Sequence, residues 1–391
     1  MKKIYVCVLS CMVAVDALAT YTGHVFVDKN GNGVFDKGEK TLSGVMVSDG
    51  LNVVKTERDG SFALPGHEKE RFIFITTPSG YRTDNAYYRR IETGQTMYDF
   101  GVTPYNAHVG KDGSHRFVHL SDTEISGPGS VDEHTDWVQN LRDYAANEDV
   151  AFIIHGGDIC YETGLKKHIQ LMNTENMNVP VFYSIGNHDL VKGAYGEELF
   201  ESLYGPTWYS FDVGSVHYVV TPMMGGDYAP SYRPSDVYKW LKNDLAQIPE
   251  GKPVIVFNHD LPTVGEDFVF RTKDGVELDL DAYNLKAWLY GHCHISHIHK
   301  HKKAYSICTS TPIRGGIDHT PSAFRVMNID GEGNFSSELR YTYMDKALQI
   351  ASVNDGEAPC TPSGNVLLSV NAYSCVSPVK QMTYTCRLDD G

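Results

Sequence analysis

The sequence lacks the features that mark several large classes of protein. Lys and Arg total 34 against 49 Asp and Glu, so the formal net charge is −15. Nucleic-acid binding depends on a basic surface, and we therefore expect no nucleic-acid partner. Beyond the first 19 residues, no apolar run approaches the roughly 20 residues that a membrane-spanning helix needs. These absences exclude nucleic-acid-binding and membrane-spanning proteins from the classes to consider.

Cysteine is sparse and shows no recognisable pairing. Eight cysteines are spread over 391 residues, and none of them forms a Cys-x-x-Cys pair. Two lie within the first 19 residues, and three crowd the C-terminal end, where a disulfide is possible in an oxidising compartment. Spacing alone does not determine which cysteines pair, so the sequence leaves the disulfides open.

The first 19 residues have the pattern of a secretory signal. A charged start at Lys2-Lys3 precedes an apolar run over residues 4–15, and small residues follow at 17–19. We therefore predict a signal peptide over residues 1–19 and export to the periplasm or the cell exterior. Lipoprotein anchoring through Cys11 is the alternative, and it is less favoured because little apolar sequence precedes that cysteine.

The remaining chain contains enough apolar residues for real cores, at 41% hydrophobic and 11% aromatic. Its length predicts two or three domains. Residues 21–105 show strand patterns without helical periodicity, which indicates a small β-sandwich domain. Residues 115–345 alternate strands with helices, which predicts an α/β fold. Residues 353–391 return to strands and stop at a turn without a returning strand, so we expect this C-terminal β domain to be incomplete.

One loop of the first domain matches the twelve-residue calcium template D-x-N-x-N-G-x5-E. Its six candidate ligands are Asp28, Asn30, Asn32, the Val34 carbonyl, Asp36 and Glu39. Gly33 stands where the template requires a sharp turn. The flanking segments indicate strands where a helix–loop–helix calcium motif has helices, so a metal-free turn rich in Gly and Asn is the alternative.

Five clusters of polar residues in the central region each follow a short apolar run that indicates a buried strand. The clusters are Asp122-Thr123-Glu124, Gly157-Asp158, Gly186-Asn187-His188-Asp189, Asn258-His259-Asp260 and Gly291-His292-Cys293-His294. In an α/β sheet, functional groups gather beyond the carboxyl ends of the strands. Residues i and i+2 of an extended segment point the same way, so His292 and His294 can face one centre. The pattern therefore predicts one metal site built from all five loops.

The order of these clusters resembles the calcineurin-like metallophosphoesterase superfamily, over roughly residues 115–320. The resemblance implies a layered β-sandwich flanked by helices, with an N-terminal all-β domain and a C-terminal β segment. It also implies hydrolysis of a phosphate monoester or diester by a hydroxide that bridges two divalent metals. The expected substrate is a phosphorylated small molecule, lipid or glycan.

The resemblance also assigns roles by position. One metal would take Asp122, Glu124, Asp158 and His294. The second would take Asp158 as the shared ligand, with Asn187, His259 and His292. His188 would contact the phosphate and protonate the leaving oxygen as general acid, which suits an imidazole because its charge is labile near neutral pH.

Two positions depart from the family pattern. Glu124 stands where His or Gln is usual, and the extra carboxylate favours manganese over iron or zinc because harder ions prefer oxygen ligands. Tyr161 stands where phosphoprotein phosphatases carry the Asp that orients the catalytic His, which leaves Glu162 and Asp189 as candidates for that role. Tyr161 also resembles the iron ligand of purple acid phosphatases, so a ferric site with Tyr161 as an extra ligand is an alternative.

A histidine- and lysine-rich stretch over residues 297–303 follows the last cluster. It is expected to be a solvated edge strand whose charges discourage pairing with other chains. Attraction of an anionic substrate and binding of transition metals are the alternatives. A different class, a surface binding protein with an inert site, remains open for the whole chain. Substrate identity, native metals and oligomeric state are not determined by the sequence.

Overall fold

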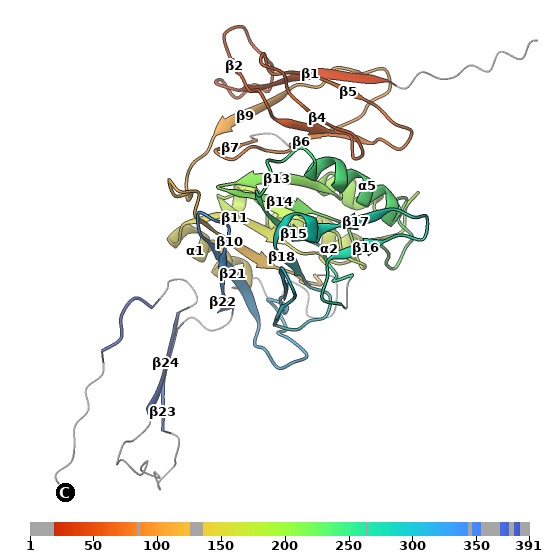
Figure 1. Cartoon of the computed structure of the whole chain (residues 1–391). Helices are drawn as coiled ribbons and strands as arrows, with labels where there is room; N and C mark the ends of the chain where they lie inside the picture. The colour runs from red at the N-terminus through yellow and green to blue at the C-terminus, as the bar shows by residue number, and fades with distance from the viewer. Residues whose placement is uncertain are drawn as a thin grey trace, which may run out of the picture.

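The computed structural model describes residues 19–83, 87–125, 136–262, 265–342, 346–352, 368–374 and 379–383. The predicted signal peptide and Cys11 therefore lie outside the described residues, apart from Ala19 at the predicted cleavage position. The N-terminal strands form two sheets stacked on the central α/β region, and the β23–β24 ribbon projects from the opposite end (Figure 1). The α/β fold that was predicted for the central region is confirmed, together with the N-terminal β domain.

The N-terminal region consists of strands only among its described residues. One sheet has the order β2-β1-β9-β7, with β5 also paired to β1, and the other has the order β4-β3-β6-β8. Their bounds are β1 Thr20–Val27, β2 Lys40–Thr41, β3 Met46–Ser48, β4 Val53–Lys55, β5 Ser61–Pro65, β6 Phe72–Ile75, β7 Tyr81–Arg82, β8 Tyr88–Arg90 and β9 Phe100–Pro104. Strand β5 alternates buried Phe62 and Leu64 with exposed neighbours, as a half-buried strand should.

The central region is built on two sheets that face each other. The five-stranded sheet has the order β12-β11-β10-β21-β22, and the six-stranded sheet has the order β13-β14-β15-β18-β20-β19. Their bounds are β10 His115–Leu120, β11 Val150–His155, β12 Val181–Tyr183, β13 Tyr209–Val213, β14 Val216–Val220, β15 Pro253–Phe257, β18 Asn284–Tyr290, β19 His297–Lys300, β20 Tyr305–Cys308, β21 Ala323–Ile329 and β22 Phe335–Tyr341. Strands β10, β11 and β12 run parallel, as do β14, β15, β18 and β20.

Helices cover the outer faces of these sheets. The helices are α1 Asp136–Asn147, α2 Tyr161–Leu171, α3 Thr174–Met177, α4 Glu198–Tyr204 and α5 Pro234–Leu245. The apolar faces of the helices are buried: Trp137, Leu141 and Tyr144 of α1 pack against the five-stranded sheet. Helix α5 begins at Pro234, because proline fits the first turn of a helix. The short helices α3 and α4 were not predicted.

The N-terminal and central regions share a hydrophobic core. Phe72 and Phe74 of β6 pack in the same buried cluster as Trp240 of α5. Hydrogen bonds cross the contact, including Trp240 Nε1 to Ser48 Oγ at 3.1 Å and a 2.8 Å bond between the hydroxyls of Thr76 and Ser210. Shared apolar burial and buried polar contacts together fix the orientation of the two regions.

The remaining elements are peripheral. A hairpin of β16 Val269–Arg271 and β17 Glu277–Asp279 precedes a short 3-10 turn at Leu280–Ala282. Strand β19 is exposed along its length at the edge of the six-stranded sheet, as predicted for the histidine-rich stretch. His301, which was included in that prediction, is instead buried and bonds to the Ser306 hydroxyl at 2.8 Å. Strands β23 Lys346–Ser352 and β24 Leu368–Ser374 form a separate antiparallel ribbon.

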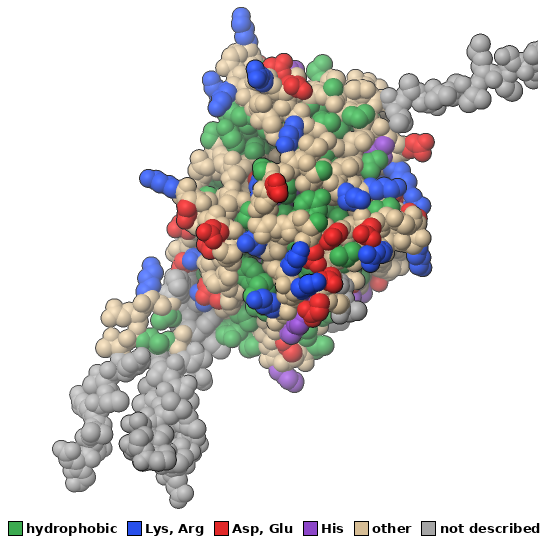
Figure 2. Space-filling view, viewed as in Figure 1, with side chains coloured by type: hydrophobic (Ala, Val, Ile, Leu, Met, Phe, Trp, Pro, Cys, Tyr) green, Lys and Arg blue, Asp and Glu red, His purple; other side chains and the backbone are tan. Residues whose placement is uncertain are grey.

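None of the helices in the described part of the chain combines the length and apolar character of a membrane span. Acidic and basic side chains are interspersed over the face in Figure 2.

Candidate metal centre

The five predicted clusters meet at the carboxyl ends of strands from both central sheets. Asp122, Asp158 and Asn187 follow β10, β11 and β12 of the five-stranded sheet. His259, His292 and His294 follow β15 and β18 of the six-stranded sheet. Parallel strands deliver their carboxyl ends to one edge of a sheet, so residues far apart in sequence arrive together. The site therefore lies where the two sheets meet.

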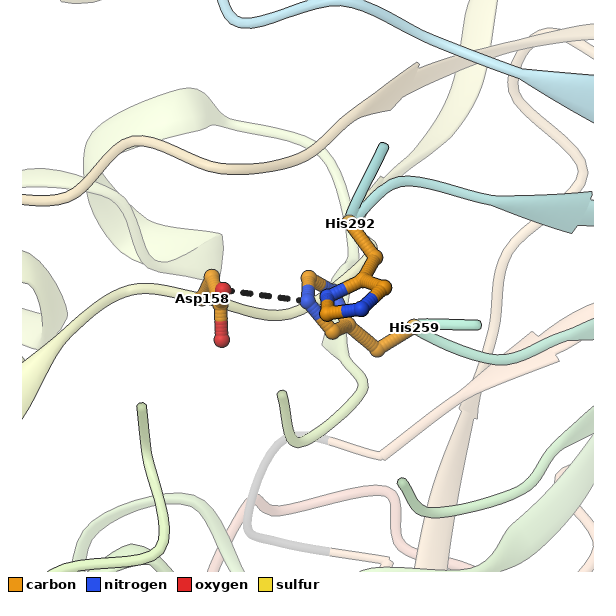
Figure 3. A group of neighbouring side chains, drawn as sticks. All are labelled: Asp158, His259 and His292. Atoms are coloured by element: carbon orange, nitrogen blue, oxygen red, sulfur yellow. Dashed lines mark ion pairs between the residues drawn. The ribbon is translucent and has the colours of Figure 1, made fainter. Parts of the chain in front are cut away.

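Three of the predicted ligands form a compact group, which we call the Asp158 group: Asp158, His259 and His292. Their potential ligand atoms all lie within 4.8 Å of one another. His259 Nε2 is 3.1 Å from Asp158 Oδ2, and the rings of His259 and His292 meet edge-on at 5.1 Å between centroids. The three side chains come from separate loops and point into one space (Figure 3).

Three more of the predicted ligands form a second group, the Glu124 group: Asp122, Glu124 and His294. His294 Nε2 lies 3.3 Å from Asp122 Oδ1 and 3.4 Å from Glu124 Oε1. Asp122 Oδ1 is also 3.8 Å from His259 Nε2, and the carboxylate accepts the backbone N–H of His292 at 3.1 Å. Asp122 therefore touches residues of both groups, so the two groups are neighbouring halves of one site.

Two buried atoms at this site lack hydrogen-bond partners among the described residues. They are the side-chain oxygen of Asn187 and Nε2 of His259, whose 3.1 Å approach to Asp158 is not an aligned hydrogen bond. Buried polar atoms are nearly always satisfied, so unpaired atoms beside carboxylates indicate a missing partner. Carboxylate, imidazole and amide donors together suit divalent metal ions. The residues present therefore fit a metal centre.

The backbone of the ligand loops is strained. Asp122, Glu124, Asp158, His292 and His294 all have positive φ angles, between 45° and 60°. Each such residue costs about 1–3 kcal/mol and persists only where its surroundings enforce it, and such strain clusters at functional sites. Gly186 and Gly291 allow the close packing, because a Cβ there would lie 2.2 Å from Asp158 Oδ1 and 2.3 Å from Asp122 Oδ2.

The electrostatics of the site favour positive charge. His259 is completely buried, and burial opposes its charge. The carboxylates of Asp158 and Asp122 nevertheless raise the pKa of His259 to about 10. Carboxylates that favour a proton on a buried imidazole will also attract cations.

The orienting partner of His188 is Asp227, a residue that the sequence analysis missed. His188 Nδ1 lies 2.8 Å from Asp227 Oδ2. Burial lowers the pKa of His188, but the Asp227 hydrogen bond and nearby carboxylates outweigh it and leave a raised pKa. Asp227 lies in the loop after β14 and not directly at the strand end, so the pattern that revealed the other clusters does not single it out.

Neither candidate for that orienting role contacts the His188 ring. Asp189 is completely buried and accepts the backbone N–H groups of Gly186 and Cys160, both at 2.8 Å. Burial raises the pKa of Asp189 to about 7. Its role is therefore to fix the loop that carries Asn187. Glu162 is exposed in the first turn of α2.

Two further side chains border the site. Tyr161 is partly exposed, and its ring centroid lies 5.5 Å from that of His188. Partial burial and the neighbouring groups raise the pKa of Tyr161, which favours the neutral phenol. Arg314, also missed by the sequence analysis, forms an ion pair with Glu124. This pair offsets the charge of the third carboxylate.

Comparisons with known proteins agree with this geometry. Residues 115–296 match the family model described as calcineurin-like phosphoesterase. Residues 29–105 match the model of the N-terminal region of calcineurin-like phosphoesterase. No curated protein matches the sequence of this chain.

Similar solved structures are distant in sequence. Purple acid phosphatase PPD1 from yellow lupin (Lupinus luteus) seeds is 15% identical, with 88% of this chain and 73% of that one covered, at a TM-score of 0.42. GAP50, the anchor in the inner membrane complex of Plasmodium, is 13% identical, with 59% and 85% covered, at 0.39. A putative 5'-nucleotidase from Staphylococcus aureus is 15% identical, with 57% and 52% covered, at 0.34.

The family models cover the two regions that carry the shared core and the metal centre. The metal-compatible residues of the central region lie at the strand ends, as the resemblance implied. The chain therefore belongs to the calcineurin-like phosphoesterase family and is a metal-dependent phosphoesterase.

Proposed function

We propose that this protein hydrolyses a phosphate ester at a centre that holds two divalent cations, with His188 as the general acid. The observation that carries the proposal is the meeting of the Asp158 group and the Glu124 group at Asp122. Two adjoining sets of ligands around shared carboxylates are the arrangement that a two-metal phosphoesterase needs.

The two cations would be held by the residues that the resemblance assigns. The Glu124 group with Asp158 would hold one, and the Asp158 group with Asn187 would hold the other. Bound cations would lower the pKa of a water molecule and stabilise the charge on the phosphoryl oxygens. Three carboxylates among the ligands favour manganese over zinc or iron, because harder ions prefer oxygen donors.

His188 is suited to protonate the leaving oxygen. Its Nδ1–H donates to Asp227, which fixes the ring orientation and leaves Nε2 to carry the proton that is transferred. The backbone N–H of His188 donates to Asp158 Oδ1 at 3.0 Å, so the acid is tied to a metal ligand. The carboxylate partner also favours the protonated imidazole that a general acid requires.

The test is hydrolysis of aryl phosphate monoesters and diesters by protein stripped of metal and reloaded with manganese, zinc or iron. We expect activity to return most strongly with manganese and to fall by about 100-fold or more in His188→Ala, as expected when a general acid is lost. Equal activity with zinc alone would contradict the metal assignment. Wild-type activity that persists in His188→Ala would contradict the role of His188.

The iron alternative has its own readout. If Tyr161 ligates ferric iron, then iron-loaded protein shows a visible charge-transfer band that is absent from Tyr161→Phe. Colourless iron-loaded protein would exclude it. The choice between a monoester and a diester, and among small-molecule, lipid and glycan phosphates, is settled by comparing rates on matched pairs of substrates.

We also propose that the loop over residues 28–39 binds calcium. In the structure, Asp28 accepts the N–H groups of Gly31 and Gly33 at 2.7 Å, and Glu39 accepts those of Lys29 and Asp36. These bonds hold the carboxylates inside the loop, as a calcium loop requires. Calcium should raise the melting temperature of the wild type but not of Glu39→Ala, and no shift in either would refute it. Export is tested by sequencing the N-terminus of the protein recovered outside the cytoplasm. Removal of the predicted signal peptide leaves a chain that begins at residue 20.

A further inference from the structure

Arg71, in the N-terminal domain, reaches into the central domain and joins two of its segments. Its Nε and Nη2 donate to the Glu201 carboxylate at 2.6–2.9 Å. Nη2 also donates to Glu197 at 2.9 Å, and Nη1 donates to the Ser231 hydroxyl at 2.9 Å. The guanidinium stacks over the Tyr195 ring at 4.7 Å. One side chain thus engages the start of α4 and the loop after β14.

The contact between these two segments depends on the same carboxylates. Glu197 is completely buried and accepts both the hydroxyl and the backbone N–H of Ser231. The backbone N–H of Gly196 donates to the Ala229 carbonyl at 3.0 Å. A Cβ at Gly196 would lie 2.9 Å from that carbonyl oxygen, so the two backbone segments are in close contact. The segment 228–231 is therefore pinned to residues 195–197.

The pinned loop carries the partner of the general acid. Asp227 lies four residues before Ser231, and its backbone N–H donates to the Asn187 carbonyl at 3.0 Å. A Cβ at Gly226 would lie 2.2 Å from that same carbonyl oxygen. Farther along, the Tyr232 hydroxyl donates to the Met223 carbonyl at 2.6 Å. The loop is held at the metal ligand Asn187 on one side and at Arg71 on the other.

We propose that Arg71 is a positioning residue for catalysis, because it holds Asp227 against His188 through Glu197 and Ser231. The N-terminal domain is then a working part of the active site. This inference rests on the proposed role of His188 as general acid.

The charge balance explains why the linkage is rigid. The Glu197 and Glu201 side chains are 0% and 2% exposed, and Arg71 is the cation that pairs with both. Breaking a buried ion pair leaves an uncompensated buried charge, which is strongly unfavourable. The forked guanidinium satisfies both carboxylates and the hydroxyl at once, a geometry that the point charge of lysine does not reproduce.

The test compares substrates that differ in their need for an acid. The leaving group of a dinitrophenyl phosphate departs with little protonation. The leaving group of an alkyl phosphate needs a proton from a general acid. The variants are Arg71→Lys, which keeps the charge but loses the fork, and Ser231→Ala, which removes one hydroxyl. Lys55→Ala is the matched control, because it removes another hydrogen bond between the domains, to the Gln247 carbonyl, away from the loop.

We expect kcat on the alkyl ester to fall about 10-fold or more in Arg71→Lys, and in the same direction in Ser231→Ala, since a mispositioned acid loses part of its contribution. Loss on the dinitrophenyl ester should be much smaller, KM and metal content should be unchanged, and Lys55→Ala should behave as the wild type. Should Arg71→Lys fail to fold, Ser231→Ala carries the same comparison.

The outcomes separate this inference from the proposed function. His188→Ala should show the same dependence on the leaving group, to a greater degree. If His188→Ala lacks that dependence, the general-acid assignment is wrong. If His188→Ala shows it while Arg71→Lys and Ser231→Ala lose activity equally on both esters, or not at all, then the positioning role of Arg71 is wrong and the proposed function stands.

Discussion

Two buried histidines of this protein sit between aspartates and serve different purposes. His217 of β14 donates from both ring nitrogens, to Asp212 at 2.8 Å and to Asp244 at 2.8 Å. His259 uses Nδ1 toward the Gly156 carbonyl at 3.0 Å, while Nε2 faces Asp158 without an aligned hydrogen bond. Both imidazoles are completely buried. The first cluster is closed, and the second leaves ligand atoms unsatisfied.

The backbone around the two histidines differs in the same way. Asp212, His217 and Asp244 lie within β13, β14 and α5, in regular conformations. The ligands around His259 lie on loops with left-handed φ angles. Residue type and charge alone therefore do not distinguish a structural cluster from a metal centre. Unsatisfied atoms on strained loops make the distinction.

The largest expected effect is the loss of activity when the cluster around His259 loses one of its carboxylates. Asp158→Asn should lower kcat/KM by more than about 100-fold. Mutation of residues that only hydrogen-bond to a metal ligand already lowers metal affinity or activity by about 10- to 100-fold. The fold should survive, since the amide keeps the shape of the carboxylate and its oxygen can still accept the backbone N–H of His188. Activity assays, metal analysis and thermal unfolding of the same preparation check this. An active Asp158→Asn enzyme with normal metal content would overturn the assignment.

Disruption of the cluster around His217 should lower stability and leave activity nearly unchanged. His217→Gln leaves the buried Asp244 without its ion pair, whereas Asp212 keeps Lys252 at 2.8 Å. We expect a loss of about 3 kcal/mol in unfolding free energy at pH 6. Activity per folded molecule should change little. Denaturant unfolding and kcat, measured on the same preparation, test the pair of expectations.

The effect of His217 should also depend on pH. Burial opposes its charge, but Asp244 and Asp212 raise the pKa of His217 to about 9. Because the folded pKa lies above the unfolded value of about 6.5, its stabilisation is complete below pH 6.5 and is lost as the pH rises through 9. The stability difference between wild type and His217→Gln should therefore shrink at alkaline pH, and a constant difference would refute the charge assignment.

A smaller effect is expected at the edge of the open cluster. Asp227→Asn keeps a hydrogen-bonding side chain beside His188 but removes the charge that favours the imidazolium. We expect kcat to fall by about 10-fold, a part of the general-acid contribution, with metal content unchanged. Metal loss in this variant would show that the residue acts on the ligands instead.

The smallest effect is expected at Tyr161. Because this side chain is 44% exposed, Tyr161→Phe should change the unfolding free energy by less than about 0.5 kcal/mol. The activity of manganese-loaded protein should be nearly unchanged if Tyr161 is not a ligand. A large loss of activity would favour the alternative iron site.

The strand ends and the helix faces were predictable, because apolar runs and periodicity report burial directly. The five clusters were found in this way, and the structure brings them together. Asp227 and Arg314 were missed because each acts through a loop whose course depends on tertiary contacts. Gly226, which precedes Asp227, allows close packing on Asn187, and no local pattern specifies that contact. The arrangement in two sheets came from the resemblance, since periodicity does not tell which strands are neighbours.

The seam between the two central sheets has a consequence for how far apart the metal ligands lie. Asp122 and Asp158 follow strands of one sheet, and His259 and His292 follow strands of the other, so the thickness of the aromatic core between the sheets influences the ligand spacing. Phe117 meets Phe257 edge-on at 5.7 Å between ring centroids, two residues before His259 in the chain. A smaller side chain at Phe257 would let the two sheets pack closer together and shorten the distances between the ligands. Metal preference can therefore change through substitutions that touch no ligand.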